Sequence, residues 1–184
     1  MTPDQLATLK ADMLASPDMA GIPMTNAGTE QIRALYNTAS TTDVWRTEAP
    51  VKGIYDAIDW SKYTPSDAAD GTAIQTNRLL SIQTKQMNLQ NMLQGRDTID
   101  ASKANIRAGL RDAVTQLPAG ASGAMVASGG TSGSAVLAAC VRKATRFEKL
   151  FSTGPVTTGS TSANLLVLEG QLSSDDAQTA RELA

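Results

Sequence analysis

Residues 71–117 read GTAIQTNRLLSIQTKQMNLQNMLQGRDTIDASKANIRAGLRDAVTQL and predict two helices joined by a short break. In the first helix, from about Thr72 to Gln94, apolar or amide side chains recur every three or four residues, the spacing with which one helix packs on another. These seam positions are Leu79, Ile82, Gln86, Leu89 and Leu93. Gly95 is a typical C-terminal glycine, and we expect a second helix from Asp97 or Thr98 to Leu117. So short a break requires the helices to lie antiparallel or to bend sharply against each other.

The composition favours helix packing. Aromatic residues are 4% of the chain, and Ala, Leu, Ile and Met supply most of its 41% of hydrophobic residues. Small aliphatic side chains suit helix bundles, whereas sheets are usually rich in aromatic and β-branched residues. We therefore expect a mainly α fold, a helical bundle with a long antiparallel helix pair, extended Gly/Ser-rich arms and at most a small β element.

The length of 184 residues fits one domain with extended arms. We expect a helical body with N-terminal arm helices over residues 1–117 and a Gly/Ser/Ala-rich loop over residues 118–134. A helix packing on the body should follow over residues 135–151, and a C-terminal arm with a short strand and a terminal helix over residues 152–184.

Helix capping signals stand near both ends of the chain. Thr2 and Gln5 have the spacing of a capping box, with Pro3 in the first turn. Ser173 or Ser174 precedes two acidic residues, which are favourable at the start of a helix. We expect a helix to begin at each of these places.

The expected strand near the C-terminus has no partner in this fold. It consists of Leu165, Leu166, Val167 and Leu168. A lone strand leaves its backbone groups unpaired. We therefore expect it to add to the sheet of a neighbouring chain, or to pair with a strand of this chain that the sequence does not reveal.

Charge is spread unevenly along the chain, whose net charge is −2. Residues 1–72 hold ten acidic and five basic residues, a net charge of −5, and residues 96–149 hold eight basic and four acidic residues, a net charge of +4. A chain with an acidic front and a basic middle can dock head-to-tail on a copy of itself or on a partner of opposite sign. The alternative is that these charges form ordinary solvated helix faces.

A basic stripe is expected on the second helix, at Lys103, Arg107 and Arg111, spaced four residues apart. A second basic cluster consists of Arg142, Lys143, Arg146 and Lys149. Such residues can line a DNA channel by following a phosphate backbone, meet an acidic protein surface, or be solvated. The low pI of about 5.1 and the lack of a DNA-reading motif favour a protein surface or solvent over DNA.

Both tryptophans, Trp45 and Trp60, fall in one window together with Tyr55 and Tyr63. Two interpretations remain open. The aromatic side chains form a small core of the domain, or the tryptophans are exposed anchors for a partner subunit.

The sequence lacks the residues that usually carry catalysis. It has no histidine, which removes the commonest general base and the commonest metal ligand. Ser81 and Lys85, four residues apart, have no expected oxyanion hole nearby, and Asp56 and Asp59 alone are too few ligands for a cation. The Gly129–Ser134 loop lacks the lysine of a phosphate-binding loop. We expect no catalytic residue, no cofactor and no metal site, and hence no enzyme.

The single cysteine, Cys140, stands between Ala139 and Val141, so we expect it to be a small buried hydrophobic residue. One cysteine cannot form a disulfide within the chain, which suits synthesis in a reducing cytoplasm. No signal peptide and no apolar run long enough for a membrane span is visible. The sequence therefore predicts a soluble protein without membrane contact.

Four phrases of the sequence resemble small proteins encoded among the virion structural genes of tailed bacteriophages. They are Val44-Trp45-Arg46-Thr47, Ile58-Asp59-Trp60, MNLQNMLQGRDTIDA at residues 87–101 and RAGLRDAV at residues 107–114. The resemblance covers roughly residues 42–117, with a looser echo in the closing strand and helix, and it contains no catalytic motif.

The resemblance implies, by analogy, a virion component made in the host cytoplasm. Small helical phage proteins of this size are similar to head–tail connectors, also called neck or adaptor proteins, which form rings beneath the portal. The implied partners are further copies of the chain, the portal, and tail or neck proteins, with non-specific contact with packaged DNA as an option. The alternatives are a tail-completion or capsid-decorating protein, or a protein–protein adaptor that forms no ring.

Overall fold

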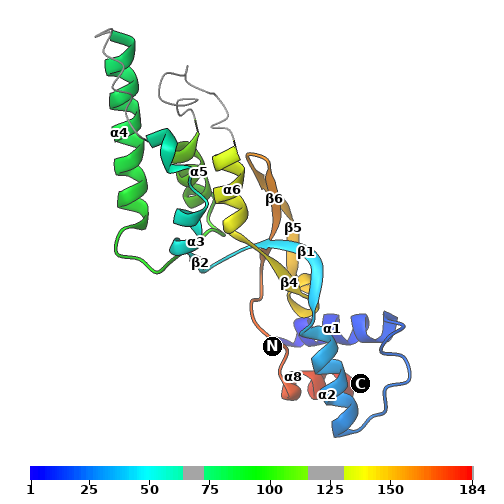
Figure 1. The fold of residues 1–184 in the computed structure, drawn as a ribbon. Coiled ribbons are helices and arrows are strands. Elements are labelled where there is room, and N and C mark those ends of the chain that lie inside the picture. The colour runs from blue at the N-terminus through cyan, green and yellow to red at the C-terminus, as the bar shows by residue number, and fades with distance from the viewer. Residues whose placement is uncertain (64–72, 116–130, 184) are drawn as a thin grey trace. The chain divides into compact units, whose positions relative to one another are not determined.

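The structure, a computed structural model, describes residues 1–63, 73–115 and 131–183, which form a mixed α/β fold (Figure 1). The expected helical bundle with at most a small β element is wrong, because a four-stranded mixed sheet forms within these residues. The elements are α1 (Pro3–Ala15), α2 (Asn26–Tyr36), β1 (Ala39–Trp45), β2 (Ala49–Pro50), α3 (Val51–Asp56), the 3₁₀-helix η1 (Trp60–Tyr63), α4 (Ala73–Leu93), β3 (Thr98–Ile99), α5 (Ala104–Val114), α6 (Thr131–Ala139), β4 (Val141–Thr145), α7 (Arg146–Leu150), β5 (Ser152–Thr158), β6 (Thr161–Leu166) and α8 (Ser174–Glu182).

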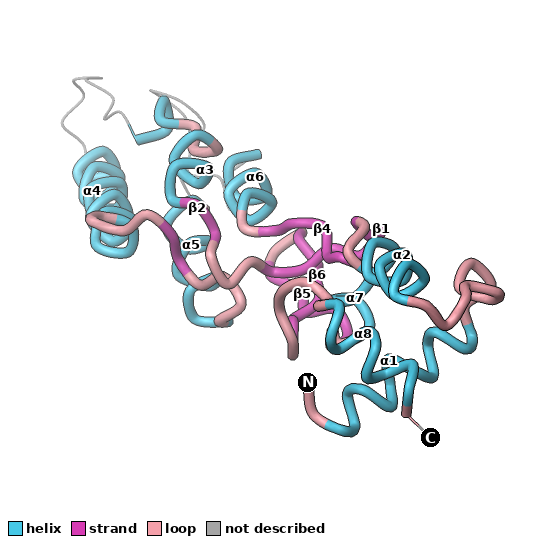
Figure 2. The backbone as a smooth tube through the Cα atoms, turned by 90° about the horizontal axis from the view of Figure 1, so that it is seen from below, coloured by secondary structure: helices cyan, strands magenta, loops and turns pink. Residues whose placement is uncertain are grey.

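The larger sheet has the strand order β4-β1-β6-β5, drawn in magenta in Figure 2. β1 and β6 are parallel, with Val44 opposite Asn164. The backbone N–H of Arg46 donates to the carbonyl of Cys140, and that of Arg146 donates to the carbonyl of Thr38, so β4 runs antiparallel to β1. β5 and β6 are joined by a tight turn in which Gly159 has a φ of 60°.

The strands were missed because their sequences are poor in large apolar residues. β1 reads ASTTDVW and β5 reads STGPVTT, and their Ser, Thr and Gly residues are also typical of linkers. The β-branched threonines nevertheless favour extended backbone. The helix expected over residues 135–151 is also wrong, since α6 ends at Ala139 and is followed by β4 and the short α7.

A second, two-stranded sheet corrects the expected helix pair. α4 ends at Leu93 and Gly95 has a φ of 72°, which confirms the predicted C-terminal glycine. The following helix, however, begins only at Ala104, because Thr98–Ile99 forms β3 and pairs antiparallel with β2. The break between the two helices is therefore longer than the sequence suggested.

The described chain divides into two compact units. Unit 1 comprises Met1–Thr42, Lys143–Thr153 and Leu166–Ala184, and unit 2 comprises Asp43–Arg142 and Gly154–Leu165. In unit 1, the helices α1, α2, α7 and α8 surround a hydrophobic core. Its residues are Leu9, Met13, Met19, Ile32, Tyr36, Phe147, Leu172, Ala177 and Ala180. Both predicted helix starts in this unit are confirmed, because Thr2 and Gln5 form the capping box of α1 and Ser173 caps α8.

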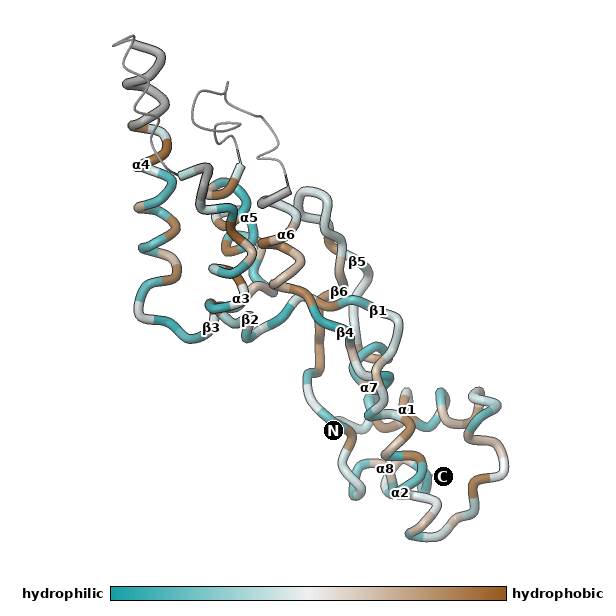
Figure 3. Tube along the Cα trace, viewed as in Figure 1, coloured by the Kyte–Doolittle hydropathy of each residue, from teal (hydrophilic) through white to brown (hydrophobic). Residues whose placement is uncertain are grey.

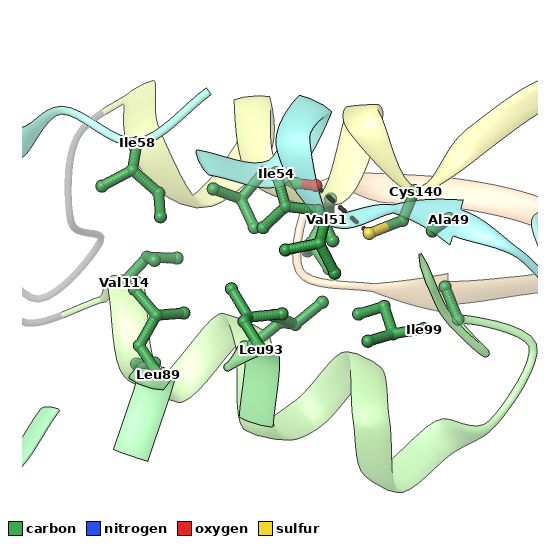
Figure 4. Close-up of a cluster of buried hydrophobic side chains, with 14 of the residues drawn as sticks. Ala49, Val51, Ile54, Ile58, Leu89, Leu93, Ile99, Val114 and Cys140 are labelled. Carbon is green, nitrogen blue, oxygen red and sulfur yellow. Dashed lines mark hydrogen bonds between the residues drawn. The ribbon is translucent and has the colours of Figure 1, made fainter. Parts of the chain in front are cut away.

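Unit 2 is built around the buried face of α4. Ile82, Leu89 and Leu93 are each at most 3% exposed, which confirms these three seam positions. Figure 4 shows Leu89 and Leu93 among side chains of α3 and α5. The side chain of Leu79 and most of the predicted Gly/Ser/Ala-rich loop, including Gly129 and Gly130, lie outside the described residues.

Candidate interaction surface

Arg107, the central residue of the predicted basic stripe, is buried and only 2% exposed. Its Nη1 donates to the carbonyl oxygens of Ala101 (2.8 Å) and Ser102 (2.6 Å), and its Nε donates to Thr158 Oγ1 (3.1 Å). The guanidinium also lies over the ring of Trp45, with Cζ 4.8 Å from the centroid. A buried guanidinium is tolerated when its donors are paired in this way. Arg107 therefore stabilises unit 2 from within and cannot line a DNA channel or a protein interface.

The two tryptophans take different places. Trp45 is fully buried, and its Nε1 donates to the carbonyl of Val156 in β5 (3.1 Å). Trp60 is 44% exposed and stacks on Tyr55, with the ring centroids 5.8 Å apart. Trp45 is thus a core residue, and of the two only Trp60 presents a surface to a partner.

The other predicted basic residues do not gather on one face of one unit. In unit 2, Lys103 is exposed and pairs with Asp100 (3.4 Å), Arg111 is exposed, and Arg142 is half-buried. In unit 1, Lys143 is exposed and its ammonium donates to the carbonyl of Thr41.

Arg146 belongs to a hydrogen-bonded cluster inside unit 1. Its guanidinium donates to Asp18 Oδ2 (2.5 Å) and Ser16 Oγ (2.6 Å) and lies over the ring of Tyr36. The Tyr36 hydroxyl in turn donates to Asp12 (2.6 Å). The hydrogen bond to Asp18 raises the pKa of Arg146, and the same bond lowers the pKa of Asp18. The cluster ties the end of α1 to α2 and α7, which is a structural role.

The strand near the C-terminus has its partners within this chain. Leu165 and Leu166 belong to β6, which lies between β1 and β5 in the sheet. The backbone N–H of Val167 donates to the carbonyl of Phe151, and Leu168 packs against the core of unit 1. Because β6 is an interior strand, it has no open edge to offer to a neighbour.

The sheet edges are protected against strand addition. Pro155 in the edge strand β5 has no N–H to donate, and the opposite edge strand β4 carries Arg142 and Lys143. Proline and charged side chains on edge strands are known to discourage pairing with another chain. A surface for a partner is therefore expected on the helices.

A groove of about 680 Å³ lies between α4 and α5. Its walls are mainly apolar or neutral, and it is lined by Leu80, Ser81, Thr84, Lys85, Asn88, Asn91, Met92, Gly109, Asp112 and Ala113. Gly109 allows α4 to approach, because a Cβ there would lie 3.0 Å from the Cε and Sδ atoms of Met92. Leu80 at the groove and Met87 on the same helix are 56% and 58% exposed. Hydrophobic and hydrophilic residues alternate along this helix in Figure 3.

Lys85 links α4 to α5 at the groove through a hydrogen bond. Its ammonium donates to the carbonyl of Asp112 (2.5 Å), one of the last carbonyls of α5, which have no partner within the helix. A cation at this end also interacts favourably with the helix dipole. Burial lowers the pKa of Lys85, while the Asp112 carboxylate opposes that shift. Lys85 thus acts as a cap supplied by a neighbouring helix.

The groove brings Ser81 and Lys85 together without the other parts of a nucleophilic site. The lysine donates to a backbone carbonyl, and the remaining lining residues add amides, a hydroxyl, the Asp112 carboxylate and apolar groups. Asp56 pairs with Lys52 (2.6 Å) on an exposed surface. Within residues 1–63, 73–115 and 131–183, no group of three or more Cys, Asp or Glu side chains is placed to hold a metal ion.

Cys140 is fully buried, as the sequence predicts, and its Sγ donates to the carbonyl of Val136 (3.4 Å; Figure 4). Burial raises the pKa of its thiol to about 11. A thiol that is protonated and inaccessible is a poor nucleophile.

The described helices include none with the length and apolar character that crossing a membrane requires. The groove itself was not foreseen, but α4 carries a signal for it in the repeat of Leu80, Thr84, Met87 and Asn91.

In comparisons with known proteins, no family model, no characterised protein and no solved structure matches this chain.

Proposed function

We propose that this protein is a non-enzymatic structural component of a tailed-phage virion, and that it works as one protomer of a head–tail connector ring beneath the portal. The observation that carries the proposal is the exposed neutral surface of α4, where Leu80 and Met87 stand among amide and hydroxyl side chains beside the groove with α5. Exposed apolar surface with a polar surround is characteristic of protein–protein interaction sites. The described side chains of α4, over residues 80–93, offer such a surface along about 21 Å.

The uses of the buried charged residues support a role in packing. Arg107 binds backbone carbonyls and a hydroxyl, and Glu148, which is 2% exposed, accepts the backbone N–H groups of Thr145 and Gly170. Catalytic sites instead hold titratable groups that converge on a cleft with capacity left for a substrate. In the described part of the chain, no buried side-chain nitrogen or oxygen lacks a hydrogen-bond partner.

The resemblance of residues 42–117 to phage virion proteins supplies the biological context. It suggests a virion location and, as partners, further copies of this chain, the portal and the tail or neck proteins. Of the basic residues considered for contact with packaged DNA, Lys103 at the N-cap of α5 and Arg111 within α5 are exposed.

Immunogold labelling of intact particles tests this proposal. An antibody against the purified protein should label the junction of head and tail in particles made from the genome that encodes this chain. Label on the capsid surface or the tail would indicate the alternative of a decorating or tail-completion protein. Particles that contain the protein nowhere, by labelling and by mass spectrometry, would contradict a virion role.

A further inference from the structure

α4 carries a second repeating seam on the face opposite its buried one. Leu80, Thr84, Met87 and Asn91 are spaced by four, three and four residues, and all four are exposed. The buried seam of Ile82, Gln86, Leu89 and Leu93 has the same spacing two positions later, which is about half a turn around the helix. The inner seam is covered by unit 2, and no described residue covers the outer one.

The outer seam has the residue pattern of a parallel coiled-coil pair. In a heptad frame, Leu80 and Met87 occupy d positions, and Thr84 and Asn91 occupy a positions. In a parallel pair, each layer contains the same residue from both helices, so that apolar residues meet apolar residues and asparagine meets asparagine. Asparagine at an a position favours two strands and fixes their register.

The flanks of this seam match a second copy better than a charged partner. The e and g positions beside it are Ser81, Gln83, Asn88 and Gln90, none of which is charged. Opposite charges at these positions usually select a different partner, and like charges would repel an identical helix. A neutral flank offers no complement to an acidic or a basic helix and no repulsion to itself.

We propose that a second copy of this chain docks on the outer seam, with its own α4 parallel and in register. Leu80 then meets the partner's Leu80, and Met87 meets the partner's Met87. This inference rests on the proposed self-assembly of the protein, and it identifies the surface through which two copies bind each other. Because the same residues meet across it, this contact is isologous and joins two copies about a two-fold axis, so a ring also needs a second, heterologous contact elsewhere on the chain.

The contact is expected to depend on concentration. Each helix contributes two large apolar side chains to it, so the seam alone falls short of the roughly 1,200 Å² that stable interfaces bury. In a ring built from such pairs, the second contact would act at the same time as this one and compensate for its weakness.

Disulfide cross-linking tests this arrangement, because the single native cysteine, Cys140, is buried. Met87→Cys and Leu80→Cys should each form a covalent dimer under mild oxidation. The matched control is Gln90→Cys, since Gln90 is exposed on the same helix but lies about a quarter turn from the seam. It should form at least tenfold less dimer, and circular dichroism of each variant verifies its fold.

Other outcomes overturn the proposal. Equal cross-linking of Gln90→Cys and Met87→Cys would mean random collision. Strong cross-linking in a mixture of Thr84→Cys and Met87→Cys, with none in either alone, would mean an antiparallel pair. If the wild type forms oligomers but neither Leu80→Cys nor Met87→Cys cross-links, the proposed docking surface is wrong and the ring is unaffected. If the wild type is strictly monomeric and neither variant cross-links, the proposed ring is contradicted as well.

Discussion

Arg107 connects three segments of unit 2 at the scale of a single residue. Its planar guanidinium reaches two carbonyl oxygens before α5, the Thr158 hydroxyl at the end of β5, and the ring of Trp45 in β1. Burial lowers its pKa and the Asp100 carboxylate opposes the shift, but a guanidinium stays charged at any ordinary pH. This geometry depends on the shape of the side chain as well as on its charge.

Replacing Arg107 by lysine should therefore destabilise the protein although the charge is kept. An ammonium group cannot reach the carbonyls and the Thr158 hydroxyl at once, and it loses the flat contact with Trp45. We expect a loss of about 2–4 kcal/mol in the free energy of unfolding, measured by urea denaturation. The matched control Arg111→Lys, one turn later and exposed, should change it by less than about 0.5 kcal/mol. Equal effects of the two substitutions would contradict the structural role of Arg107.

Because Cys140 is buried, we expect the folded protein to lose stability at alkaline pH. Burial raises the pKa of its thiol from 9.0 to about 11, so the folded state binds the proton more tightly than the unfolded state does. The resulting stabilisation is complete below pH 9 and is lost as the pH rises through 11. Two pKa units correspond to about 2–3 kcal/mol.

Cys140→Ala is the variant that isolates this effect. Denaturation curves at pH 8.5 and pH 11 should show a smaller loss of unfolding free energy for the variant than for the wild type. The comparison concerns the change with pH, so the cost of the missing sulfur at either pH cancels. An identical pH dependence in both proteins would show that the Cys140 thiol is not protected by burial.

At the scale of elements, two glycines in helices face different neighbours. In α2, a Cβ at Gly28 would lie 2.0 Å from the backbone oxygen of Pro23. In α5, a Cβ at Gly109 would lie 3.0 Å from the end of the Met92 side chain. Backbone cannot move aside as easily as a flexible methionine can.

Gly28→Ala should consequently destabilise the protein, by about 1–3 kcal/mol, because α2 or the preceding loop must shift. Gly109→Ala should lie within about 1 kcal/mol of the wild type, since alanine's helix propensity offsets the displacement of Met92. Thermal unfolding of the two variants side by side measures the difference. A Gly28→Ala protein as stable as Gly109→Ala would mean that the loop before α2 does not approach the helix as described.

The elements that the sequence predicted well are those with strong local signals. The apolar seam of α4, its C-terminal glycine and the caps of α1 and α8 each depend on residues close together in the chain. The strands depend on distant partners, since β1 pairs with β6 and β4, and β5 looks like a linker until β6 lies beside it. Arg107 was placed on the surface because helical spacing identifies residues that share a face and does not show which face is buried. The groove could be predicted only in part, because its second wall requires the packing of α5 on α4.

At the scale of the whole molecule, we propose that this protein acts by assembling with copies of itself through α4. Arg107 in unit 2 and Arg146 in unit 1 are held in internal hydrogen bonds, and the exposed seam of α4 is an uncharged surface available to a partner. We therefore expect the fraction of associated protein to increase with protein concentration.

Sedimentation velocity over a series of concentrations measures this most directly. The wild type should shift from monomer toward larger species as its concentration rises, while Leu80→Gln/Met87→Gln, which keeps good helix formers at exposed positions, should remain monomeric over the same range. A wild type that stays monomeric at every concentration, or a double variant that associates as strongly as the wild type, would contradict the claim.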